Sequence, residues 1–337
     1  MNVLVTGGAG FIGSHTVVEL VQAGFHPFII DDLSNSSESV LLGLKHILGK
    51  DIPFYKADCN DFEIVKEIVN KNNIEGIIHF AAFKAVGESV AQPLKYYKNN
   101  IGSLLNVLEV MRSTGVKNLV FSSSCTVYGQ PDLIPVTEDI PKKKTESPYG
   151  NTKAIAEDIL EDVVKSGEPM SIISLRYFNP IGAHESAEIG ELPNGVPSNL
   201  VPFVTQTAIG KRPKLVVFGN DYNTEDGSNI RDFIHVVDLA KAHVSALNLL
   251  KSKGGNYYDV FNIGTGRGNS VLEVINIFEK VNNVKLNYEI GPRRPGDIEK
   301  IFGNVEKAKN ILNWQTEKTL EESLRDAWAW ELKLNNK

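Results

Sequence analysis

The sequence contains only two cysteines, Cys59 and Cys125, among its 337 residues. Two cysteines are too few for a disulfide framework or a zinc site, so we expect free thiols in a reducing compartment and no metal. Positive charge is also scarce, because 35 Lys and Arg residues face 41 Asp and Glu residues, giving a net charge of −6. This balance, with no long basic tract, argues against a nucleic-acid partner.

Long apolar runs are absent as well. No stretch of the sequence approaches the ~20 apolar residues that cross a membrane. The N-terminus has no basic segment before its first apolar stretch, which glycines interrupt. We therefore expect a cytoplasmic protein with no membrane partner. The composition, 42% hydrophobic and 23% charged, is that of a globular chain.

What the sequence does contain is a repeated strand–helix order in its first half. The predicted strands are apolar throughout, which is typical of strands covered on both faces. The pattern predicts an α/β fold with a doubly wound parallel Rossmann sheet. Strands are predicted at residues 2–6, 28–31, 53–58, 76–82, 118–124 and 171–178, and helices at 13–24, 37–48, 61–72, 92–114 and 149–165.

The regular order ends at Asn179 and Pro180, where a long stretch rich in Gly, Pro, Asn and Glu begins. A single core stops growing near ~250–300 residues, so we expect residues 1–179 to form the sheet domain and 180–337 a smaller mixed α/β substrate lobe, with short segments crossing the boundary. Ligands of such sheets bind at the carboxyl ends of the strands, which places the cleft between the lobes. The second lobe is predicted to have helices at 199–209, 237–251, 270–281, 304–312 and 319–331, and strands at 214–219, 259–264 and 285–290.

A glycine-rich turn joins the first predicted strand to the first predicted helix. In "VTGGAGFIGSH", Gly8, Gly10 and Gly13 have the G-x-G-x-x-G spacing, and Gly7, Gly10 and Gly13 fit G-x-x-G-x-x-G. Glycines in this turn let backbone N–H groups approach a pyrophosphate, and the helix N-terminus favours its negative charge. The alternative is a plain tight turn, but three glycines in register favour a dinucleotide site.

Acidic residues follow the second and third predicted strands. Asp31 stands where such sites place a carboxylate for the ribose diol. The segment "LSNSSES" after Asp32 contains no Lys or Arg, so a 2′-phosphate would meet a carboxylate without a nearby cation. This favours NAD over NADP. Asp58 could contact the adenine or could be a turn residue, and the sequence leaves both readings open.

Three polar residues are candidates for the reaction centre. Ser124 ends the fifth predicted strand, while Tyr149 and Lys153 lie one helical turn apart in "SPYGNTK". A phenol has a pKa of ~10, and a nearby ammonium favours its ionised form. We expect Tyr149 to act as a general base, with Ser124 on the substrate oxygen and Lys153 beside the phenol. A solvent-exposed contact is the alternative for the Tyr–Lys pair alone.

These residues together resemble the extended short-chain dehydrogenase/reductase superfamily. Within it, the chain is most similar to the UDP-glucose 4-epimerase family, and the similar segments span nearly the whole sequence. The segments are "HFAAFKAVGESV", "FSSSCTVYG", "SPYGNTK", "LRYFNPIGAH", "FGNDYNTEDGSNIRDFIHVVDLA", "GTGRGNSVLEV" and "RRPGD".

The resemblance implies interconversion of UDP-glucose and UDP-galactose without net oxidation. Tightly bound NAD takes hydride from C4 of the hexose, the 4-keto sugar rotates, and hydride returns to the opposite face. It also implies a homodimer. The cofactor-binding residues that it implies are Gly7, Gly10, Phe11, Ile12, Gly13, Asp31, Asn35, Asp58, Cys59, Phe80, Ala81, Ala82, Lys84, Asn99, Ser122, Tyr149, Lys153 and Phe178. The substrate-binding residues that it implies are Ser124, Tyr149, Asn179, Asn199, Leu200, Val216, Phe218, Arg231, Arg294, Asp297 and Ile301.

Three other functions remain open at this point. A 4-epimerase of another UDP-sugar is the nearest, and by resemblance the size of Ile301 limits the group at sugar C2; Ile favours unacetylated sugars. A 4,6-dehydratase would carry Thr-Asp-Glu where this chain has Ser124, Cys125 and Thr126, so the carboxylates for water loss are missing. A non-enzymatic NAD-binding regulator is disfavoured by the intact Tyr149–Lys153 pair.

Overall fold

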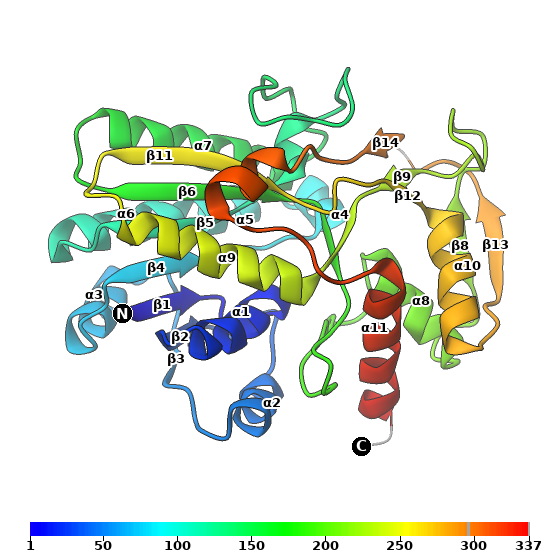
Figure 1. Cartoon of the computed structure of the whole chain (residues 1–337), viewed down its shortest axis with the longest axis horizontal. Helices are drawn as coiled ribbons and strands as arrows, with labels where there is room; N and C mark the ends of the chain where they lie inside the picture. The colour runs from blue at the N-terminus through cyan, green and yellow to red at the C-terminus, as the bar shows by residue number, and fades with distance from the viewer. Residues whose placement is uncertain (295–296, 336–337) are drawn as a thin grey trace.

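A seven-stranded parallel sheet forms the centre of the computed structural model, which describes residues 1–294 and 297–335. The strand order is β11-β6-β5-β4-β1-β2-β3 (Figure 1). This confirms the predicted doubly wound Rossmann sheet. The strands are β1 (Asn2–Thr6), β2 (His26–Asp31), β3 (Phe54–Lys56), β4 (Gly76–His79), β5 (Asn118–Ser124), β6 (Ser171–Tyr177) and β11 (Tyr257–Ile263).

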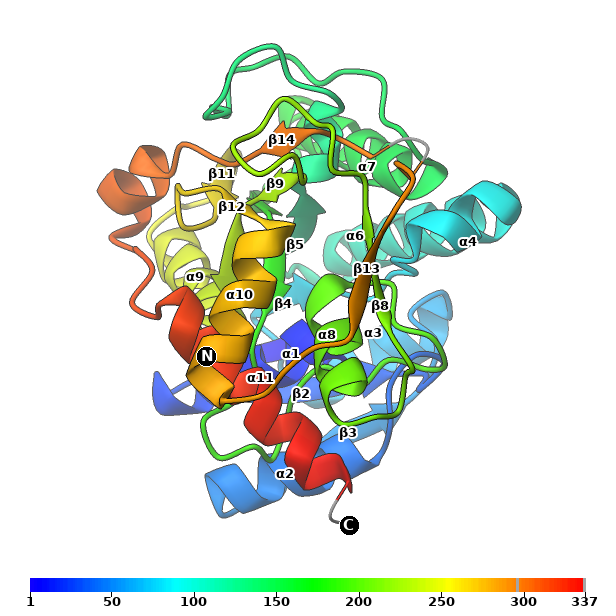
Figure 2. The ribbon, with the colours of Figure 1, turned by 90° about the vertical axis from the view of Figure 1, so that its right-hand side faces the viewer.

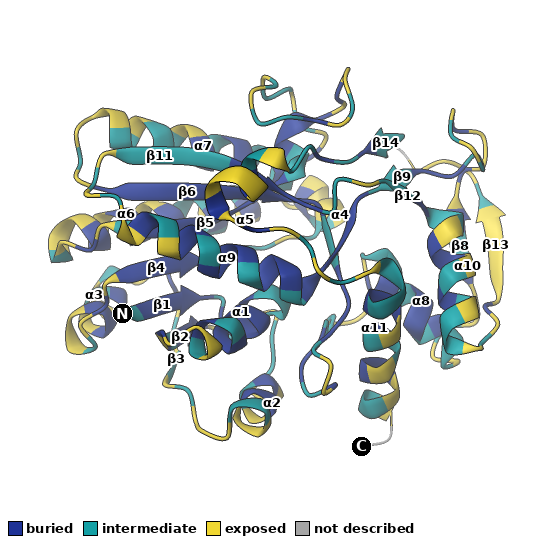
Figure 3. Cartoon of the chain, viewed as in Figure 1, coloured by how far each residue is buried: buried dark blue, intermediate teal, exposed yellow. Residues whose placement is uncertain are grey.

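Helices cover both faces of the sheet. On one face α1 (Phe11–Gln22), α2 (Ser39–Leu48) and α9 (Val236–Lys251) share a hydrophobic core with the strands. On the other face α3 (Phe62–Lys71), α6 (Gly102–Thr114) and α7 (Pro148–Lys165) form a second core. The strands between these layers are mostly buried, as the apolar sequence runs predicted (Figure 3).

The predicted helix 92–114 is present from Pro93 to Thr114, and a separate short helix precedes it. Gln92 has φ −133° and ψ 60°, so α4 (Val86–Ala91) ends there and α5 (Pro93–Tyr96) starts at the following proline. A π-helical turn, Tyr97–Ile101, then leads into α6. A proline is favoured in the first turn of a helix because it has no N–H to pair, which explains the restart.

The second lobe has its own small core and lies at one end of the sheet (Figure 2). The short parallel pair β8 (Leu215–Phe218) and β13 (Tyr288–Gly291) packs with the three helices α8 (Leu200–Ala208), α10 (Val271–Asn282) and α11 (Leu320–Asn335). A π-helical turn, Ala308–Leu312, replaces part of the predicted helix 304–312. Short strands that the sequence did not predict are β7 (Asn179–Ile181), β9 (Ile230–Arg231), β10 (Phe233–His235), β12 (Asn269–Ser270) and β14 (Lys300–Ile301).

Part of the second half of the chain returns to the sheet. β11, expected in the smaller lobe, pairs in parallel with β6 over its full length, and α9 packs against α1. Pairing with β6 covers an otherwise open sheet edge, a long-range contact that local sequence patterns do not encode. The division into residues 1–179 and 180–337 stays a prediction.

The described residues contain neither a membrane-spanning helix nor a metal-binding cluster. No helix in residues 1–294 and 297–335 combines the length and apolarity needed to span a membrane. The same residues contain no group of three or more His, Cys, Asp or Glu side chains placed to hold a metal ion.

Candidate active site

A cavity of about 510 Å³ opens at the carboxyl ends of the strands. β1 lies between β2 and β4 there, which is the point where the strand order reverses and where open α/β sheets bind ligands. The predicted cofactor residues that line it are Gly7, Gly10, Phe11, Ile12, Gly13, Asp31, Asn35, Asp58, Cys59, Phe80, Ala81, Ala82, Lys84, Asn99, Ser122, Tyr149 and Lys153. Of the predicted set, only Phe178 is not among the lining residues; it packs in a neighbouring cluster with Ile301.

The glycine loop has no room for side chains at two positions. A Cβ atom on Gly13 would come within 2.3 Å of the Gly7 carbonyl oxygen, and one on Gly7 would lie 2.9 Å from the Ala81 nitrogen. Gly7 also has φ +67°, a conformation that favours glycine. The loop therefore brings bare backbone to the cavity at the N-terminus of α1, where the first N–H groups have no intrahelical partners.

Asp31 ends β2 at the edge of the same cavity and is 7% exposed. Its carboxylate accepts hydrogen bonds from the Ala9 N–H (3.0 Å), the Leu33 N–H (2.9 Å) and the Ser36 hydroxyl (2.8 Å). Burial raises the pKa of this carboxyl group, and these donors oppose the shift. The bonds orient the carboxylate, and an oxygen atom can accept more than one donor, so a ribose hydroxyl can still be bound.

The residues that frame Tyr149 come from β5 and the start of α7. Ser147 caps α7 by accepting a hydrogen bond from the Gly150 N–H at 3.1 Å, and Pro148 occupies the first turn. Tyr149 is half-buried and lines the cavity. Ser124, at the end of β5, is 8% exposed; its hydroxyl lowers the pKa of the neighbouring Tyr149 phenol and accepts from the Thr126 N–H at 3.2 Å. The fold thus places two of the three predicted catalytic residues side by side.

Lys153 lies one turn beyond Tyr149 and is 4% exposed. Its ammonium donates to the Ser122 carbonyl at 2.6 Å and lies 4.9 Å from the centre of the Phe121 ring. Burial lowers the pKa of Lys153 to about 7, and the Glu157 carboxylate opposes that shift. Burial therefore makes the ammonium form of Lys153 less favoured than that of a solvent-exposed lysine.

Taken together, the protein's own groups raise the pKa of Tyr149 and do not lower it. Burial raises the pKa of Tyr149 to about 12, and the neighbouring Ser124 hydroxyl only partly offsets this. The physical reason is that both side chains lie in the same poorly solvated pocket, which disfavours the phenolate and the ammonium alike. A base role for Tyr149 therefore requires further positive charge in the cavity.

Tyr177 and Glu191 are among the cavity residues that the sequence analysis missed. Tyr177 ends β6, and its hydroxyl contacts the Ser122 hydroxyl in a short hydrogen bond. Its place at a strand end was a usable signal, as it was for Ser124. Glu191 lies in the Gly- and Pro-rich segment before α8, and it had no local motif to identify it.

Tyr149 is the one predicted substrate residue among those that line this cavity. The residues outside its lining are Ser124, Asn179, Asn199, Leu200, Val216, Phe218, Arg231, Arg294, Asp297 and Ile301, all within the described part of the chain. Asp297 joins two of them, since its carboxylate is 3.4 Å from the Arg231 guanidinium and 2.8 Å from that of Arg294. Pro295 and Gly296, which separate Arg294 from Asp297 in the motif "RRPGD", lie outside the described residues.

A second group of these residues is spread along short strands and a helix start. Asn179 and Val216 lie on β7 and β8, and Leu200 is the first residue of α8. Phe218 is 41% exposed, with the Arg294 guanidinium 5.7 Å from its ring centre. Ile301, in contrast, is 2% exposed and buried beside Tyr128 and other apolar side chains.

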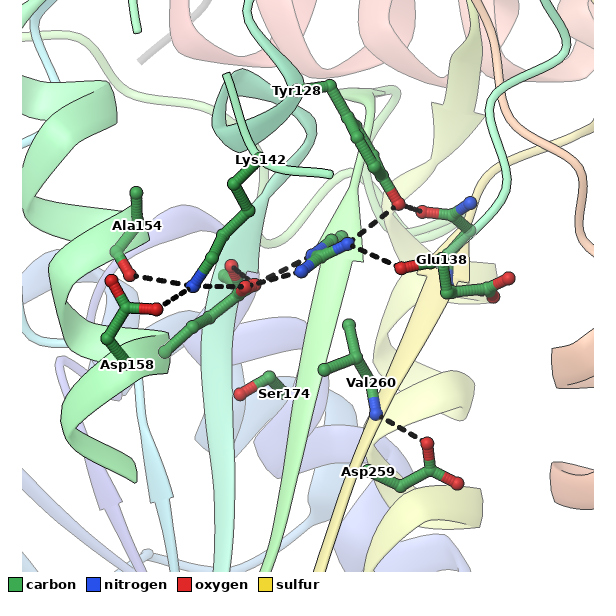
Figure 4. Close-up of polar contacts among 12 residues, drawn as sticks. Tyr128, Glu138, Lys142, Ala154, Asp158, Ser174, Asp259 and Val260 are labelled. Carbon is green, nitrogen blue, oxygen red and sulfur yellow. Dashed lines mark hydrogen bonds and ion pairs between the residues drawn. The ribbon is translucent and has the colours of Figure 1, made fainter. Parts of the chain in front are cut away.

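A buried polar network connects α7 to the sheet (Figure 4). Glu157, one turn after Lys153, accepts from Arg176 Nε at 2.9 Å and from Arg176 Nη2 at 2.6 Å. Ser123 donates to the same carboxylate at 2.5 Å, and Arg176 also donates to the Tyr128 hydroxyl at 3.1 Å. The network ties α7 to β5 and β6, the strands that end beside the reaction centre.

The residues present fit NAD. The glycine loop, which has no room for a Cβ atom at Gly7 or Gly13, leaves its backbone N–H groups free to donate to a pyrophosphate. Asp31 supplies an acceptor for a ribose diol. The cavity volume of about 510 Å³ suits an extended cofactor.

Comparisons with known proteins agree with this geometry. A family model described as GDP-mannose 4,6 dehydratase matches residues 4–327. A UDP-glucose 4-epimerase of Bacillus subtilis (strain 168) is 52% identical, over 98% of this chain and 97% of that protein. Another, from Dictyostelium discoideum, is 51% identical over 98% and 95% of the two chains.

Solved structures are similar over the full length. A UDP-glucose-4-epimerase of Stenotrophomonas maltophila, with bound NAD and formylated UDP-arabinopyranose, has a TM-score of 0.97 and 45% identity, covering 100% of this chain and 99% of that one. The enzyme of Bifidobacterium longum, in complex with NAD+ and UDP, has a TM-score of 0.95, 45% identity and the same coverage. The glycine loop, the Ser-Tyr-Lys group and these similarities lead to one conclusion: the chain belongs to the UDP-glucose 4-epimerase family of the extended short-chain dehydrogenases/reductases.

Proposed function

We propose that this chain interconverts UDP-glucose and UDP-galactose by inversion at C4, as an isomerase of galactose metabolism. The observation that carries the proposal is the meeting of the glycine loop, Tyr149 and Lys153 in one cavity, beside Ser124. Relatives about half identical in sequence are named UDP-glucose 4-epimerases, which supports the same activity. Two similar structures hold NAD, which supports NAD as the cofactor.

In this proposal Tyr149 moves one proton and ends as it began. Its phenolic oxygen removes the proton from the hydroxyl at sugar C4 and returns it after inversion. Ser124, beside that phenol, holds the substrate oxygen in line with it. When bound, NAD supplies a reversible two-electron oxidant for C4 and a positive ring that favours the phenolate.

Lys153 has a supporting role beside the phenol. Its pKa of about 7 leaves its charge sensitive to the surroundings, and any anionic ligand group nearby favours the ammonium form. A charged Lys153 then favours the ionised phenol. Its hydrogen bond to the Ser122 carbonyl fixes where that charge sits.

The sugar nucleotide is proposed to bind on the second-lobe side. Its diphosphate carries negative charge, and Arg231 and Arg294 offer forked donors matched to phosphate oxygens. Both guanidinium groups contact Asp297, which holds them near each other. Phe218, partly exposed beside Arg294, offers a flat apolar surface for the uracil.

The dehydratase named by the family model is not favoured by this site. Water loss requires an acid and a base next to the reacting carbons, and the end of β5 and the turn after it carry Ser124, Cys125 and Thr126 there. Burial raises the pKa of the Cys125 thiol to about 12, so it is neutral and cannot replace a carboxylate. Retention of the Tyr149–Lys153 pair likewise argues for an enzyme over a regulator.

A cytoplasmic homodimer is also part of the proposal. Both cysteines are unpaired, which suits a reducing compartment. For the dimer, the support is an apolar surface on α4, α5 and α6, where Val90 is 61%, Leu94 81% and Leu105 46% exposed. Light scattering should give twice the mass of the chain; a monomer at micromolar concentration would remove this part of the proposal.

The activity is tested with a panel of four sugar nucleotides. Purified, NAD-loaded protein is given UDP-glucose, UDP-galactose and their N-acetylated forms, and the products are separated by chromatography. We expect rapid interconversion of the first pair and slow or no conversion of the second. The family resemblance implies that the side chain at position 301 limits the group at sugar C2, and Ile301 favours an unacetylated sugar. Conversion of only the N-acetylated pair would replace the proposed substrate.

A further inference from the structure

Glu191 links the two sides of the cavity. It lies in the segment between β7 and α8 and lines the same cavity as Tyr149, with its side chain 10% exposed. One carboxylate oxygen, Oε1, accepts from Lys84 Nζ at 3.0 Å and from Asn199 Nδ2 at 2.6 Å. Lys84 follows β4 in the sheet domain, whereas Asn199 precedes α8 in the second lobe.

The backbone around Glu191 is held firmly. Its carbonyl accepts from Trp330 Nε1 on α11 at 2.9 Å. At Gly190 a Cβ atom would come within 2.5 Å of the Trp330 ring, so the chain lies directly on that side chain. A carboxylate held in this way presents its oxygen at a set position and not as part of a loose loop.

A carboxylate in this cavity calls for an explanation. The proposed ligands, NAD and a UDP-sugar, each carry a diphosphate, and an unpaired Glu191 would repel both. The ion pair with Lys84 offsets that repulsion. The Glu191 carboxylate is a shared hydrogen-bond acceptor for Lys84, which is predicted to contact the cofactor, and for Asn199, which is predicted to contact the sugar nucleotide.

We propose that Glu191 is a positioning residue that orients Lys84 toward the cofactor and Asn199 toward the sugar nucleotide. The proposal rests on the function proposed above. The two contacts of Glu191 differ in chemistry: Asn199 needs only a hydrogen-bond acceptor, whereas Lys84 needs a negative charge. Gln at position 191 keeps the acceptor and loses the charge, and Ala loses both.

Glu191→Ala and Glu191→Gln therefore give different results. For Glu191→Ala we expect KM for UDP-galactose to rise about 10- to 100-fold, as for loss of a hydrogen bond to a charged acceptor, with kcat within about threefold. For Glu191→Gln we expect KM to change less than about fivefold while NAD is retained less well through gel filtration. The matched control is Glu188→Gln, in the same segment, whose ion pairs with Lys333 and His46 lie outside the cavity lining.

A double-mutant cycle with Asn199→Ala separates positioning from a general structural effect. If Glu191 acts through Asn199, then Glu191→Ala adds little to KM in the Asn199→Ala chain. A KM of Glu191→Ala within twofold of wild type, or fully additive effects in the cycle, would overturn the proposal. Should Glu191→Ala not fold, the near-isosteric Glu191→Gln still tests the Lys84 contact through NAD retention.

The wild-type chain is assayed first, so that two failures stay distinct. If it does not convert UDP-galactose, the proposed function fails by itself. The same cycle is then measured by calorimetric binding of UDP, where an unchanged affinity in Glu191→Ala would overturn the positioning role independently.

Discussion

Replacing Glu157 by glutamine probes the buried network that supports α7 (Figure 4). Glu157 is 2% exposed, and its two oxygens accept from Arg176 at 2.9 and 2.6 Å and from Ser123 at 2.5 Å. In Glu157→Gln an NH₂ group replaces one acceptor and faces the guanidinium, so Arg176 keeps a buried charge without a counter-charge. Breaking one side of a buried pair costs about 3–5 kcal/mol of unfolding free energy.

The assay is urea unfolding followed by tryptophan fluorescence. The unfolding free energy of a typical domain is about 5–15 kcal/mol, so this loss is a large part of it. The urea concentration at the unfolding midpoint should therefore fall clearly. Glu161→Gln is the matched control: it breaks the exposed pair with Lys165 on the same helix and should leave the midpoint unchanged. In the double variant Glu157→Gln/Arg176→Met, part of the loss should be recovered, because no unpaired charge remains buried.

Two results would refute this reasoning. One is a Glu157→Gln chain whose unfolding free energy is within about 1 kcal/mol of wild type, since that is the range of an exposed pair. The other is simple additivity of the two single substitutions, which would mean that Glu157 and Arg176 do not act as a pair.

Three further predictions concern the cavity itself. Tyr149→Phe should lower kcat about 10²- to 10⁴-fold while UDP and NAD still bind by calorimetry; near-normal turnover would remove Tyr149 from the base role. Lys153 has a folded pKa of about 7, below its unfolded value of 10.5, so the unfolded chain binds more protons between these pH values. Cofactor-free wild type should therefore gain stability relative to Lys153→Met as pH rises from about 7 toward 10, and parallel urea midpoints across that window would contradict the assignment. Gly13→Ala should abolish NAD retention, because its Cβ would come within 2.3 Å of a backbone oxygen of the loop, whereas Gly87→Ala, with open space around it, should retain NAD like wild type.

The features that the sequence predicted are those with a local cause. The glycine loop could be identified because spacing, a preceding strand and a following helix all lie within a few residues. Asp31 and Ser124 could be placed at the carboxyl edge because each ends an apolar strand.

The features that escaped prediction depend on contacts between distant residues. The π-helical turn at Tyr97–Ile101 depends on a hydrogen-bond shift that the helical pattern of 92–114 does not show. The pairing of β11 with β6 joins segments more than eighty residues apart. Glu191 has no motif, and its role emerges only when Lys84 and Asn199 meet it across the cleft.

The electrostatic state of Tyr149 shows the same limit. From the sequence, an i,i+4 lysine suggested a lowered phenol pKa. In the fold, burial dominates and raises the pKa of Tyr149 to about 12, while the pKa of Lys153 falls to about 7. Burial is a property of the assembled pocket, so residue spacing alone could not reveal its sign.

The central claim is inversion at C4 without net oxidation, and one labelling experiment tests it directly. UDP-galactose deuterated at C4 is incubated with NAD-loaded protein in ordinary water, and product and substrate are examined by proton NMR. We expect UDP-glucose that retains deuterium at C4, with no accumulation of reduced cofactor in step with turnover. Loss of the label to solvent, or product formation with stoichiometric NADH, would contradict it.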